Sequence, residues 1–396
     1  MSLKPLDGLT VLELGEGVAG ALCGKFLRDY GAEVIKVEAP ANGDTTRRVG
    51  PFPNDEPDSE KSALFLYLNA GKKSLTLDID SDDGRDVIRR LVLEVEAIVE
   101  TFPPGFLAAS GLPFDDLRRR KPRLLMTSIT PFGQTGPYSA FKSNNLVSFA
   151  MGGQMNMTGD PDREPLLTAG YQADYQAGLH AFAATCIGLY ACNLQEIGQW
   201  IDISAQECQA TMLEFALPWH MYLGVGMGNR RGNQINALAG VYPTADGYAG
   251  IHIMQPQWER FARLMDPTLL EDERFANMSA RLANNDELMA RVFAWMSQQK
   301  REELYHAGQA ARVPVAFVHD VDDLLASEHL DARAFWHKVD HPAAGTATHP
   351  GPPIRFADVD ADYEPVPLLG EHTEEILADI GVRGAEMAVL RERGVI

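Results

Sequence analysis

The sequence has few cysteines, and none of them form a CxxC pair. The four cysteines of the 396-residue chain are Cys23, Cys186, Cys192 and Cys208. Disulfide frameworks and zinc ribbons both need cysteines in close, paired spacing. We therefore expect four buried, reduced thiols and no metal site. The only HxxxH spacing, His337 and His341, stands beside Pro342 in an irregular stretch, which argues against zinc there.

Positive charge is also scarce. The chain has 35 Lys and Arg against 55 Asp and Glu, a formal net charge of −20. This balance argues against a general nucleic-acid or anionic-membrane binder, although an anionic small ligand needs only a local basic cluster. The first residues, MSLKPLDGL, contain no apolar signal core. We expect a cytoplasmic protein.

One apolar run comes close to the length of a membrane span. Residues 177–194 form 18 residues of mostly apolar character, the lower limit for a span. The run contains His180 and Asn193 and lacks both an aromatic belt and a preceding charged clamp. A helix buried in a large core explains it better, so no membrane contact is expected.

The remaining composition is that of an ordinary folded protein, with 45% apolar and 23% charged residues. Strand-like and helix-like patterns alternate along the first half, which predicts a mostly parallel sheet covered on both faces. The predicted strands are 9–14, 32–38, 74–79, 97–102, 124–130 and 199–205, and the predicted helices are 21–30, 82–96, 114–123 and 177–194. The predicted fold class is α/β, with a large Rossmann-like domain and a smaller α/β domain.

The second half has a different texture. Residues 240–254 read as two strands joined at Ala245-Asp246-Gly247, a hairpin signal. Helices follow up to Gln309, then a strand at 313–318, and then an irregular Pro- and Gly-rich stretch at 341–370. A last helix covers 373–382, with Thr373 as its predicted N-cap. We expect a large domain at 1–210, completed by 330–396, and a small domain at 225–325.

A glycine motif opens the first helix. Residues 15–20, GEGVAG, follow a strand, and Glu38 ends the next strand 18 residues after Gly20. This is close to the dinucleotide fingerprint, in which glycines admit a pyrophosphate and an acid holds a ribose hydroxyl. Glycines also permit any tight strand-to-helix turn, and Glu38 is equally a polar strand end. The motif alone leaves an NAD-dependent oxidoreductase open.

Several segments, in order between residues 5 and 380, resemble the class III CoA-transferases, the family of formyl-CoA and carnitine CoA-transferases. The segments are PLDGLTVLELGEGVAG at 5–20, NAGKKSLTLDI at 69–79, VETFPPGFLAASGL at 99–112, GQTGPY at 133–138, MGGQMNMTGDPDREP at 151–165, GQWIDISAQE at 198–207 and PLLGEHTEEIL at 367–377. The resemblance implies the same strand–helix start without a nicotinamide, and an interlocked homodimer.

The resemblance also implies a nucleophile, Asp174, just before the long apolar helix. A carboxylate can attack an acyl-CoA thioester, pass through a mixed anhydride and then carry CoA as an aspartyl thioester. At a helix start its carboxylate would feel the dipole, and the neighbouring N–H groups would be placed to hold an oxyanion. Taken alone, an aspartate at this point is typically an N-cap.

Further contacts are implied residue by residue. Coenzyme A enters as substrate and product, with an acyl-CoA and a carboxylic acid as partners and no tightly bound cofactor. The implied CoA-binding residues are Val18, Ala19, Arg47, Leu77, Asp78, Ile79, Thr101, Phe102 and Lys142, and the implied acyl pocket holds Asn144, Asn145 and Arg231. Arg230 and Arg231 together suit the second carboxylate of a dicarboxylic acyl group.

The chain departs from the family pattern at its phosphate clamp. Ala39, Asp80 and Ala109 stand where the family often has basic residues. Lys72, Lys73 or Arg118–Arg120 are candidate replacements. The stretch at 230–240 lacks the glycine run of formyl-CoA transferases, so oxalate is not the preferred acceptor.

Two related alternatives stay open. An acyl-CoA racemase of the same superfamily needs a histidine after the GPY segment, where this chain has Lys142-Ser143-Asn144-Asn145. Asparagine takes no proton at neutral pH, which disfavours that chemistry. The second alternative is a catalytically silent subunit that works with a partner subunit. Asp174 argues against it and the thin phosphate clamp argues for it.

Overall fold

The structure is a computed structural model that describes residues 4–214, 216–224, 230, 232–357, 359 and 363–396. The chain divides into two compact units. Unit 1 takes in Met1–Gln154, Thr168–Glu214 and Asp331–Ile396, and unit 2 takes in Met155–Leu167 and Phe215–Leu330. The domain boundaries given above stay a prediction.

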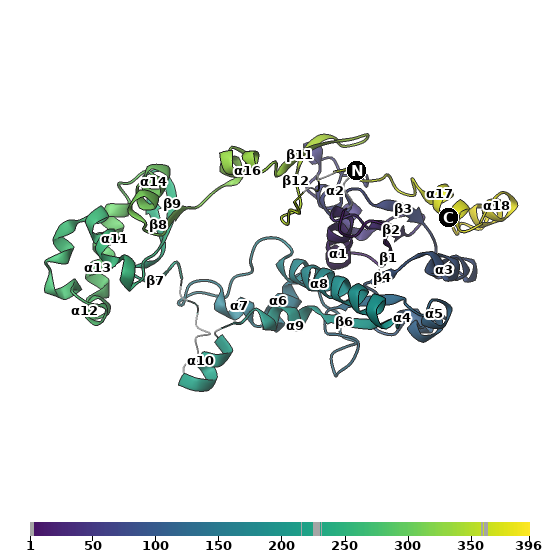
Figure 1. Ribbon diagram of the computed structural model, residues 1–396, viewed down its shortest axis with the longest axis horizontal. Helices are drawn as coiled ribbons and strands as arrows, with labels where there is room; N and C mark the ends of the chain where they lie inside the picture. The colour runs from purple at the N-terminus through teal and green to yellow at the C-terminus, as the bar shows by residue number, and fades with distance from the viewer. Residues whose placement is uncertain (1–3, 215, 225–229, 231, 358, 360–362) are drawn as a thin grey trace. The chain divides into compact units, whose positions relative to one another are not determined.

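Unit 1 is built on a six-stranded sheet in which every neighbouring pair is parallel. The strands are β1 (Thr10–Leu14), β2 (Glu33–Glu38), β3 (Lys73–Thr76), β4 (Ala97–Glu100), β5 (Leu125–Thr130) and β6 (Trp200–Ser204). Their order, β3-β2-β1-β4-β5-β6, is that of a doubly wound Rossmann-type sheet. The predicted α/β fold class is therefore confirmed (Figure 1).

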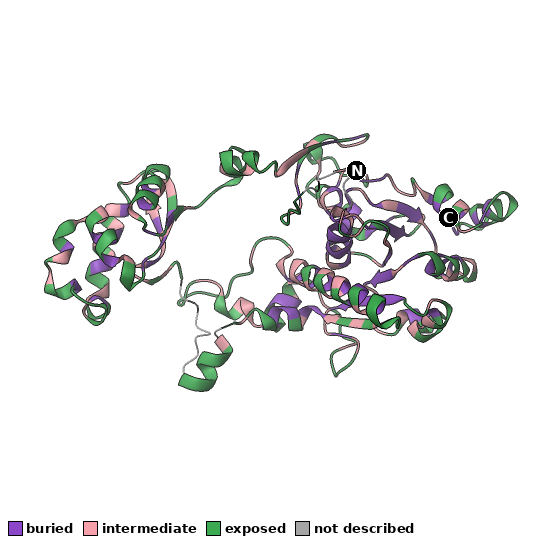
Figure 2. Ribbon diagram, in the orientation of Figure 1, coloured by how far each residue is buried: buried purple, intermediate pink, exposed green. Residues whose placement is uncertain are grey.

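The strands are apolar because helices cover the sheet, and β4 and β5 are buried at every residue. Figure 2 shows the strands of this unit as largely buried. The α-helices of unit 1 are α1 (Val18–Asp29), α2 (Ala63–Leu68), α3 (Asp82–Glu94), α4 (Phe106–Ala109), α5 (Phe114–Arg120), α6 (Asn145–Met151), α8 (Gln172–Gln195), α9 (Ala205–Thr211), α17 (Thr373–Asp379) and α18 (Ala385–Glu392). Two short 3₁₀ turns, η1 (Thr45–Arg48) and η2 (Pro53–Asp55), follow β2.

Helix α8 packs on the sheet and on α1 through small residues. A Cβ on Gly178 would lie 2.7 Å from the carbonyl oxygen of Ala19, and one on Gly188 would lie 2.7 Å from Leu125 at the start of β5. Since Gly188 lies over the amino ends of the strands, α8 runs antiparallel to them. Its first residues therefore lie at the carboxyl edge of the sheet, beside the start of α1.

The other face of α8 is apolar and exposed, which differs from the predicted helix buried in a large core. Ile187, Tyr190 and Leu194 are 70%, 68% and 67% exposed. By length and composition, α8 is the one described helix that would suffice to cross a membrane, and 39% of its apolar window is buried within the chain. Apart from Leu189, the helix buries small residues, mostly alanines and glycines, which leaves most of its large side chains outside.

Unit 2 holds a four-stranded antiparallel sheet of order β10-β9-β8-β7. Its strands are β7 (Gln234–Asn236), β8 (Ala239–Thr244), β9 (Gly247–His252) and β10 (Val315–Phe317). Its helices are α10 (Ala216–Leu223), α11 (Trp258–Met265), α12 (Met278–Ala283), α13 (Asn285–Met296), α14 (Arg301–Ala311) and α15 (Val321–Leu325), and α16 (Glu328–Ala332) crosses the boundary after Leu330. Three 3₁₀ turns lie at Gln255–Gln257, Pro267–Leu270 and Glu273–Phe275. α7 (Gln154–Met157) lies where the chain first passes between the units. The hairpin predicted at Ala245-Asp246-Gly247 is confirmed by the pairing of Thr244 with Gly247.

Two local predictions near the C-terminus are wrong. The stretch expected to be irregular contains a second hairpin, β11 (Trp336–His341) with β12 (Gly345–Pro350). The N-cap of α17 is His372, not Thr373. The Thr373 hydroxyl instead accepts a hydrogen bond from the Thr76 N–H at 3.0 Å and so ties the C-terminal segment to β3.

Candidate active site

A cavity of about 170 Å³ opens at the carboxyl edge of the unit 1 sheet. The strand order reverses between β1 and β4, and ligands of open α/β sheets bind in the crevice at such a point. The residues that line the cavity follow β1, β2, β3 and β4 and are Leu14, Gly15, Glu16, Val37, Glu38, Ala39, Asp44, Leu77, Asp78, Ile79, Asp80, Phe102 and Phe106. Phe102 and Phe106 stack on each other, with ring centroids 4.5 Å apart.

The glycine motif beside this cavity is explained by contacts within the chain. A Cβ on Gly15 would lie 2.4 Å from the Thr101 hydroxyl, and one on Gly20 would lie 2.7 Å from the Thr101 methyl. The Thr101 hydroxyl also exchanges hydrogen bonds with the Glu16 backbone, at 3.0 and 2.9 Å. Gly17 has φ 92°, a backbone conformation that favours glycine, and its N–H faces the Asp44 carboxylate at 3.3 Å. Gly15 and Gly20 therefore make room for Thr101, and Gly17 permits the turn that directs its N–H at Asp44.

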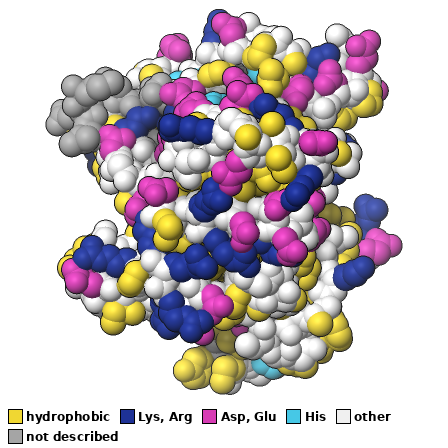
Figure 3. Space-filling view, turned by 90° about the vertical axis from the view of Figure 1, so that its right-hand side faces the viewer, with side chains coloured by type: hydrophobic (Ala, Val, Ile, Leu, Met, Phe, Trp, Pro, Cys, Tyr) yellow, Lys and Arg dark blue, Asp and Glu magenta, His cyan; other side chains and the backbone are white. Residues whose placement is uncertain are grey.

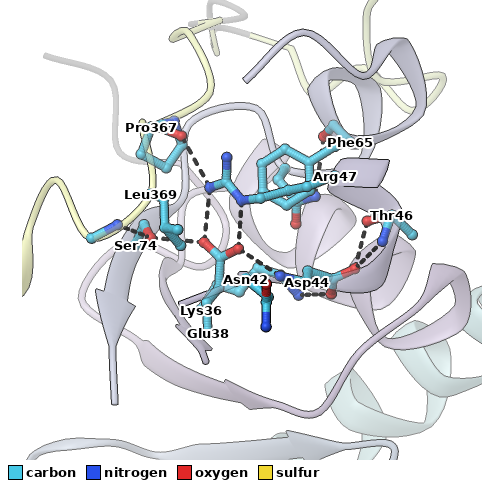
Figure 4. Close-up of polar contacts among 12 residues, drawn as sticks. Lys36, Glu38, Asn42, Asp44, Thr46, Arg47, Phe65, Ser74, Pro367 and Leu369 are labelled. Atoms are coloured by element: carbon cyan, nitrogen blue, oxygen red, sulfur yellow. Dashed lines mark hydrogen bonds and ion pairs between the residues drawn. The ribbon is translucent and has the colours of Figure 1, made fainter. Parts of the chain in front are cut away.

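The acid of the apparent fingerprint is not free for a ribose. Glu38 is buried and accepts hydrogen bonds from Arg47, at 2.6 and 2.9 Å, and from the Ser74 hydroxyl at 2.7 Å (Figure 4). Burial alone would raise the pKa of Glu38, but the Arg47 guanidinium holds it below its usual value. The glycines and the acid that suggested a dinucleotide site are therefore both explained by contacts within the chain.

Arg47 itself is 0% exposed, whereas a cation that contacts a phosphate must be accessible to the ligand. Besides Glu38, its guanidinium bonds to Glu60 at 2.8 Å and lies 3.8 Å from the centre of the Phe65 ring. The same guanidinium reaches the Pro367 carbonyl, so Arg47 joins the loop after β2 to the C-terminal segment. In this structure Arg47 is a buried structural cation, and its contact with CoA stays a prediction.

A second buried ionic cluster lies behind the glycine turn. Lys36 contacts both Glu13 and Asp44 at 2.7 Å, and Lys72 contacts Glu13 at 2.7 Å. Burial opposes ionisation of Glu13, yet the two lysines hold its pKa below the usual value. Lys72 is thus committed to the protein interior and does not replace a phosphate-binding residue at the surface.

Asp174 is the third residue of α8, and its side chain is half-buried. The N-cap position belongs to Tyr171, so Asp174 is not the N-cap that its local pattern suggested. Burial raises the pKa of Asp174 to about 6. Within the described ranges, no side chain or backbone N–H donates to its carboxylate. Tyr171 and Tyr175, on either side of it, pack against a buried cluster that includes Val18 and other residues of α1.

Asn145 fixes the start of α8. Its Oδ1 accepts hydrogen bonds from the N–H groups of Ala173, at 2.9 Å, and Asp174, at 3.4 Å, while its Nδ2 donates to the Gly170 carbonyl. These two N–H groups are therefore already bonded and do not face an oxyanion, contrary to our expectation for the first turn of α8. Asn145 lies beside Asp174 and holds the start of the helix, and its place in the acyl pocket stays a prediction.

The other predicted residues fall in three places. Asn144 is the N-cap of α6 and accepts from the Val147 N–H at 3.0 Å. Lys142 is exposed on the loop before α6 and forms no ion pair with any described residue. Arg230 belongs to unit 2, where its Nε donates to the Asp160 carbonyl, and Arg231 lies outside the described residues.

The surface cations proposed as replacements for the clamp are mostly paired with acids. Lys73 contacts Glu33 and Glu375 at 2.8 Å, and Arg118 and Arg119 pair with acids three residues before them on α5. Figure 3 shows a face of the molecule on which basic and acidic side chains are interspersed. These pairs lower the local positive charge that a phosphate would meet.

Sequence reasoning missed part of the cavity. Glu16, Val37 and Phe106 line it but were not singled out. The sequence does indicate Phe106, because it follows the Pro103-Pro104-Gly105 turn directly after β4. A turn at that point brings Phe106 next to Phe102. The local sequence does not indicate that Asn145 caps α8, since the two bonded residues, Asn145 and Ala173, are 28 residues apart.

This arrangement belongs to a known class. The model of CoA-transferase family III matches residues 6–373, and the chain belongs to that family. It is therefore an enzyme of the CoA-transferase class, for which CoA is a substrate. The expected resemblance is confirmed, and a dinucleotide oxidoreductase is not supported.

Particular relatives cover nearly the whole chain. Succinyl-CoA:(R)-benzylsuccinate CoA-transferase subunit BbsE of Thauera aromatica is 33% identical over 96% of this chain and 95% of the relative. Succinate–glutarate CoA-transferase of Agrobacterium fabrum is 32% identical over 95% and 96%. Among solved structures, a CAIB/BAIF family protein from Brucella suis is 34% identical, covers 96% of this chain and 100% of that one, and has a TM-score of 0.85.

Proposed function

We propose that the enzyme transfers CoA from an acyl-CoA to a free carboxylic acid, with Asp174 as the covalent nucleophile. The observation that carries this proposal is the Asp174 carboxylate, which is half-buried, carries no described partner and lies beside the start of α1. A carboxylate left without a partner in a folded enzyme costs stability, and such groups cluster at functional sites.

The reaction proceeds in two symmetrical halves. An Asp174 oxygen attacks the thioester carbonyl carbon and the C–S bond breaks. CoA leaves as a thiolate, and a mixed anhydride between Asp174 and the acyl group remains. The thiolate then attacks the aspartyl carbonyl carbon, releases the first acid as a carboxylate and leaves an aspartyl-CoA thioester. The acceptor carboxylate repeats both steps in reverse order, which regenerates the Asp174 carboxylate without net proton transfer.

The pKa of Asp174 suits this role. A value of about 6, raised by burial, leaves the carboxylate mostly ionised at neutral pH and more basic than a solvated aspartate. Burial also strips part of its hydration shell, so less water has to leave before it attacks. Val18 and Ala19 begin α1 next to it, where contact with the thioester arm remains our expectation.

For the acyl groups we propose short dicarboxylic acids. Relatives of this chain are named for succinate, glutarate and benzylsuccinate. Arg230 has only its Nε bonded to a described backbone group and is a candidate for the second carboxylate. We further propose a cytoplasmic homodimer. A heteromeric assembly is the alternative, and the relative BbsE is named as a subunit.

The test is a CoA-transfer assay with succinyl-CoA or acetyl-CoA and a panel of isotope-labelled acids. The wild type should form labelled acyl-CoA, and Asp174→Asn should reduce the rate by at least about a thousandfold, as for loss of a covalent nucleophile. Hydroxylamine should convert Asp174 of the wild type to a hydroxamate in the presence of acyl-CoA only. Full transfer by Asp174→Asn would refute the assignment, and α-carbon proton exchange without transfer would favour a racemase.

A further inference from the structure

The cavity at the carboxyl edge of the sheet has an unusual charge for a site that receives a CoA ester. Five of its lining residues are acids, and among the described lining residues there is no lysine or arginine. Two of the acids already have cations, since Arg47 pairs with Glu38 and Lys36 pairs with Asp44. No described cation pairs with the remaining three, Glu16, Asp78 and Asp80.

The rest of the lining suits an uncharged nucleoside. Phe102 and Phe106 offer stacked aromatic rings, and Leu14, Val37 and Leu77 add apolar walls. A purine base stacks on such rings, and carboxylates accept hydrogen bonds from ribose hydroxyl and purine amino groups. A phosphate monoester, with a charge near −2 at neutral pH, would face like charges instead.

Three described cations that could be considered for this cavity, Arg85, Lys72 and Lys73, are held within the chain, and the exposed Arg48 donates to the Asn42 carbonyl at 2.6 Å. Arg85 follows β3, and its guanidinium bonds to the Asp80 carbonyl at 2.5 Å and to the Asp82 carboxylate. Lys72 is held by Glu13, and Lys73, the first residue of β3, pairs with Glu33 and Glu375 at the amino edge of the sheet. Ala39 is exposed where β2 enters the cavity and offers no charge.

We propose that this cavity binds the adenosine end of CoA without recognising its 3′-phosphate, so that the enzyme accepts 3′-dephospho-CoA and its thioesters about as well as CoA and its thioesters. The inference rests on the proposed function for the identity of the ligand. The acidic lining selects for the nucleoside and leaves the 3′-phosphate in solvent, where water solvates its charge.

The experiment compares CoA with 3′-dephospho-CoA. Isothermal titration calorimetry should give dissociation constants within about threefold of each other, and kcat/KM for succinyl-CoA and succinyl-3′-dephospho-CoA should agree equally closely. Lowering the ionic strength from about 0.15 to about 0.01 M should favour 3′-dephospho-CoA over CoA in the ratio of their affinities. The Debye length grows from about 8 to about 30 Å, so the repulsion between the 3′-phosphate and the acids is screened less. A tenfold or greater preference for CoA, or no binding of either compound, would overturn the proposal.

A gain-of-charge variant tests the location. Ala39→Arg should shift the ratio toward CoA by about tenfold, the effect of one charge-assisted hydrogen bond. The matched control, Ala388→Arg on the exposed side of α18, adds the same charge away from the cavity and should leave the ratio unchanged. An unchanged ratio in Ala39→Arg would contradict the placement. If binding is as expected but no acid receives CoA, the proposed function fails while this inference stands.

Discussion

At the scale of single residues, the chain contrasts two kinds of buried acid. Glu13 and Glu38 are surrounded by cations that hold their pKa values low, and they serve the fold. Asp174 has no described cation, and burial raises its pKa to about 6. An acid whose desolvation is not offset by a partner destabilises the folded state, so its presence needs a reason other than stability.

This contrast predicts a pH-dependent gain in stability for Asp174→Asn. In the folded wild type the pKa of Asp174 is about 6, above the ordinary aspartate value of 3.8, so the wild type loses stability as the pH rises from about 4 to about 6. The variant avoids this loss and should be more stable by about 1–3 kcal/mol above pH 6, with no difference below pH 4. Urea unfolding followed at pH 4 and pH 8 measures both values. Equal stabilities at pH 8 would mean that the carboxylate is not desolvated.

Residue roles were only partly predictable from the sequence. Asp174 came from the family resemblance, because its local pattern alone favours an N-cap. Arg47 was expected at a phosphate and lies instead in a buried pair with Glu38, nine residues earlier in the chain. The sequence shows that a cation is present at position 47, but its burial depends on the C-terminal segment. That segment contacts Arg47 through the Pro367 carbonyl, 320 residues away.

At the scale of elements, Gly178 sets how closely α8 approaches α1. Replacing Gly178 with Leu places a Cβ 2.7 Å from the Ala19 carbonyl, a backbone atom that cannot move aside cheaply. We expect a loss of about 1–3 kcal/mol, typical of overpacking, and a lower kcat because Asp174 lies one turn away on the same helix. Thermal unfolding and the transfer assay measure the two effects.

The control for this prediction is Ala388→Leu, which adds the same side chain to an exposed position on α18. It should change neither the melting temperature nor kcat appreciably. If Gly178→Leu also kept the wild-type values, the close packing of α8 on α1 would not position Asp174.

Elements with a clear period were predictable, and those shaped by distant contacts were not. The six parallel strands follow from short apolar runs that alternate with helix patterns, and the first hairpin follows from its Asp-Gly turn. The hairpin of β11 and β12 was missed, because Pro342 and Pro350 mask its strands in an otherwise Pro- and Gly-rich stretch. Likewise, the hydroxyl of Thr373 bonds to β3, a partner that local sequence cannot indicate.

At the scale of the whole molecule, the described chain exposes more apolar surface on two helices than a lone soluble protein usually does. Besides the outer face of α8, helix α10 exposes Met221 and Tyr222, at 73% and 86%. Contiguous exposed apolar residues mark interaction surfaces. Both helices therefore support the proposed homodimer, with a second copy of the chain covering these faces.

The dimer predicts a specific dependence on the outer face of α8. Light scattering after size-exclusion chromatography should give twice the chain mass of 43.5 kDa for the wild type. The double variant Ile187→Lys, Tyr190→Lys should shift toward a single chain, because two charges would have to be buried without partners. Leu93→Lys, which alters a 48% exposed leucine on α3, is the matched control and should stay dimeric. A wild type that runs at 43.5 kDa at all concentrations would rule out the dimer, and a dimeric double variant would place its interface away from α8.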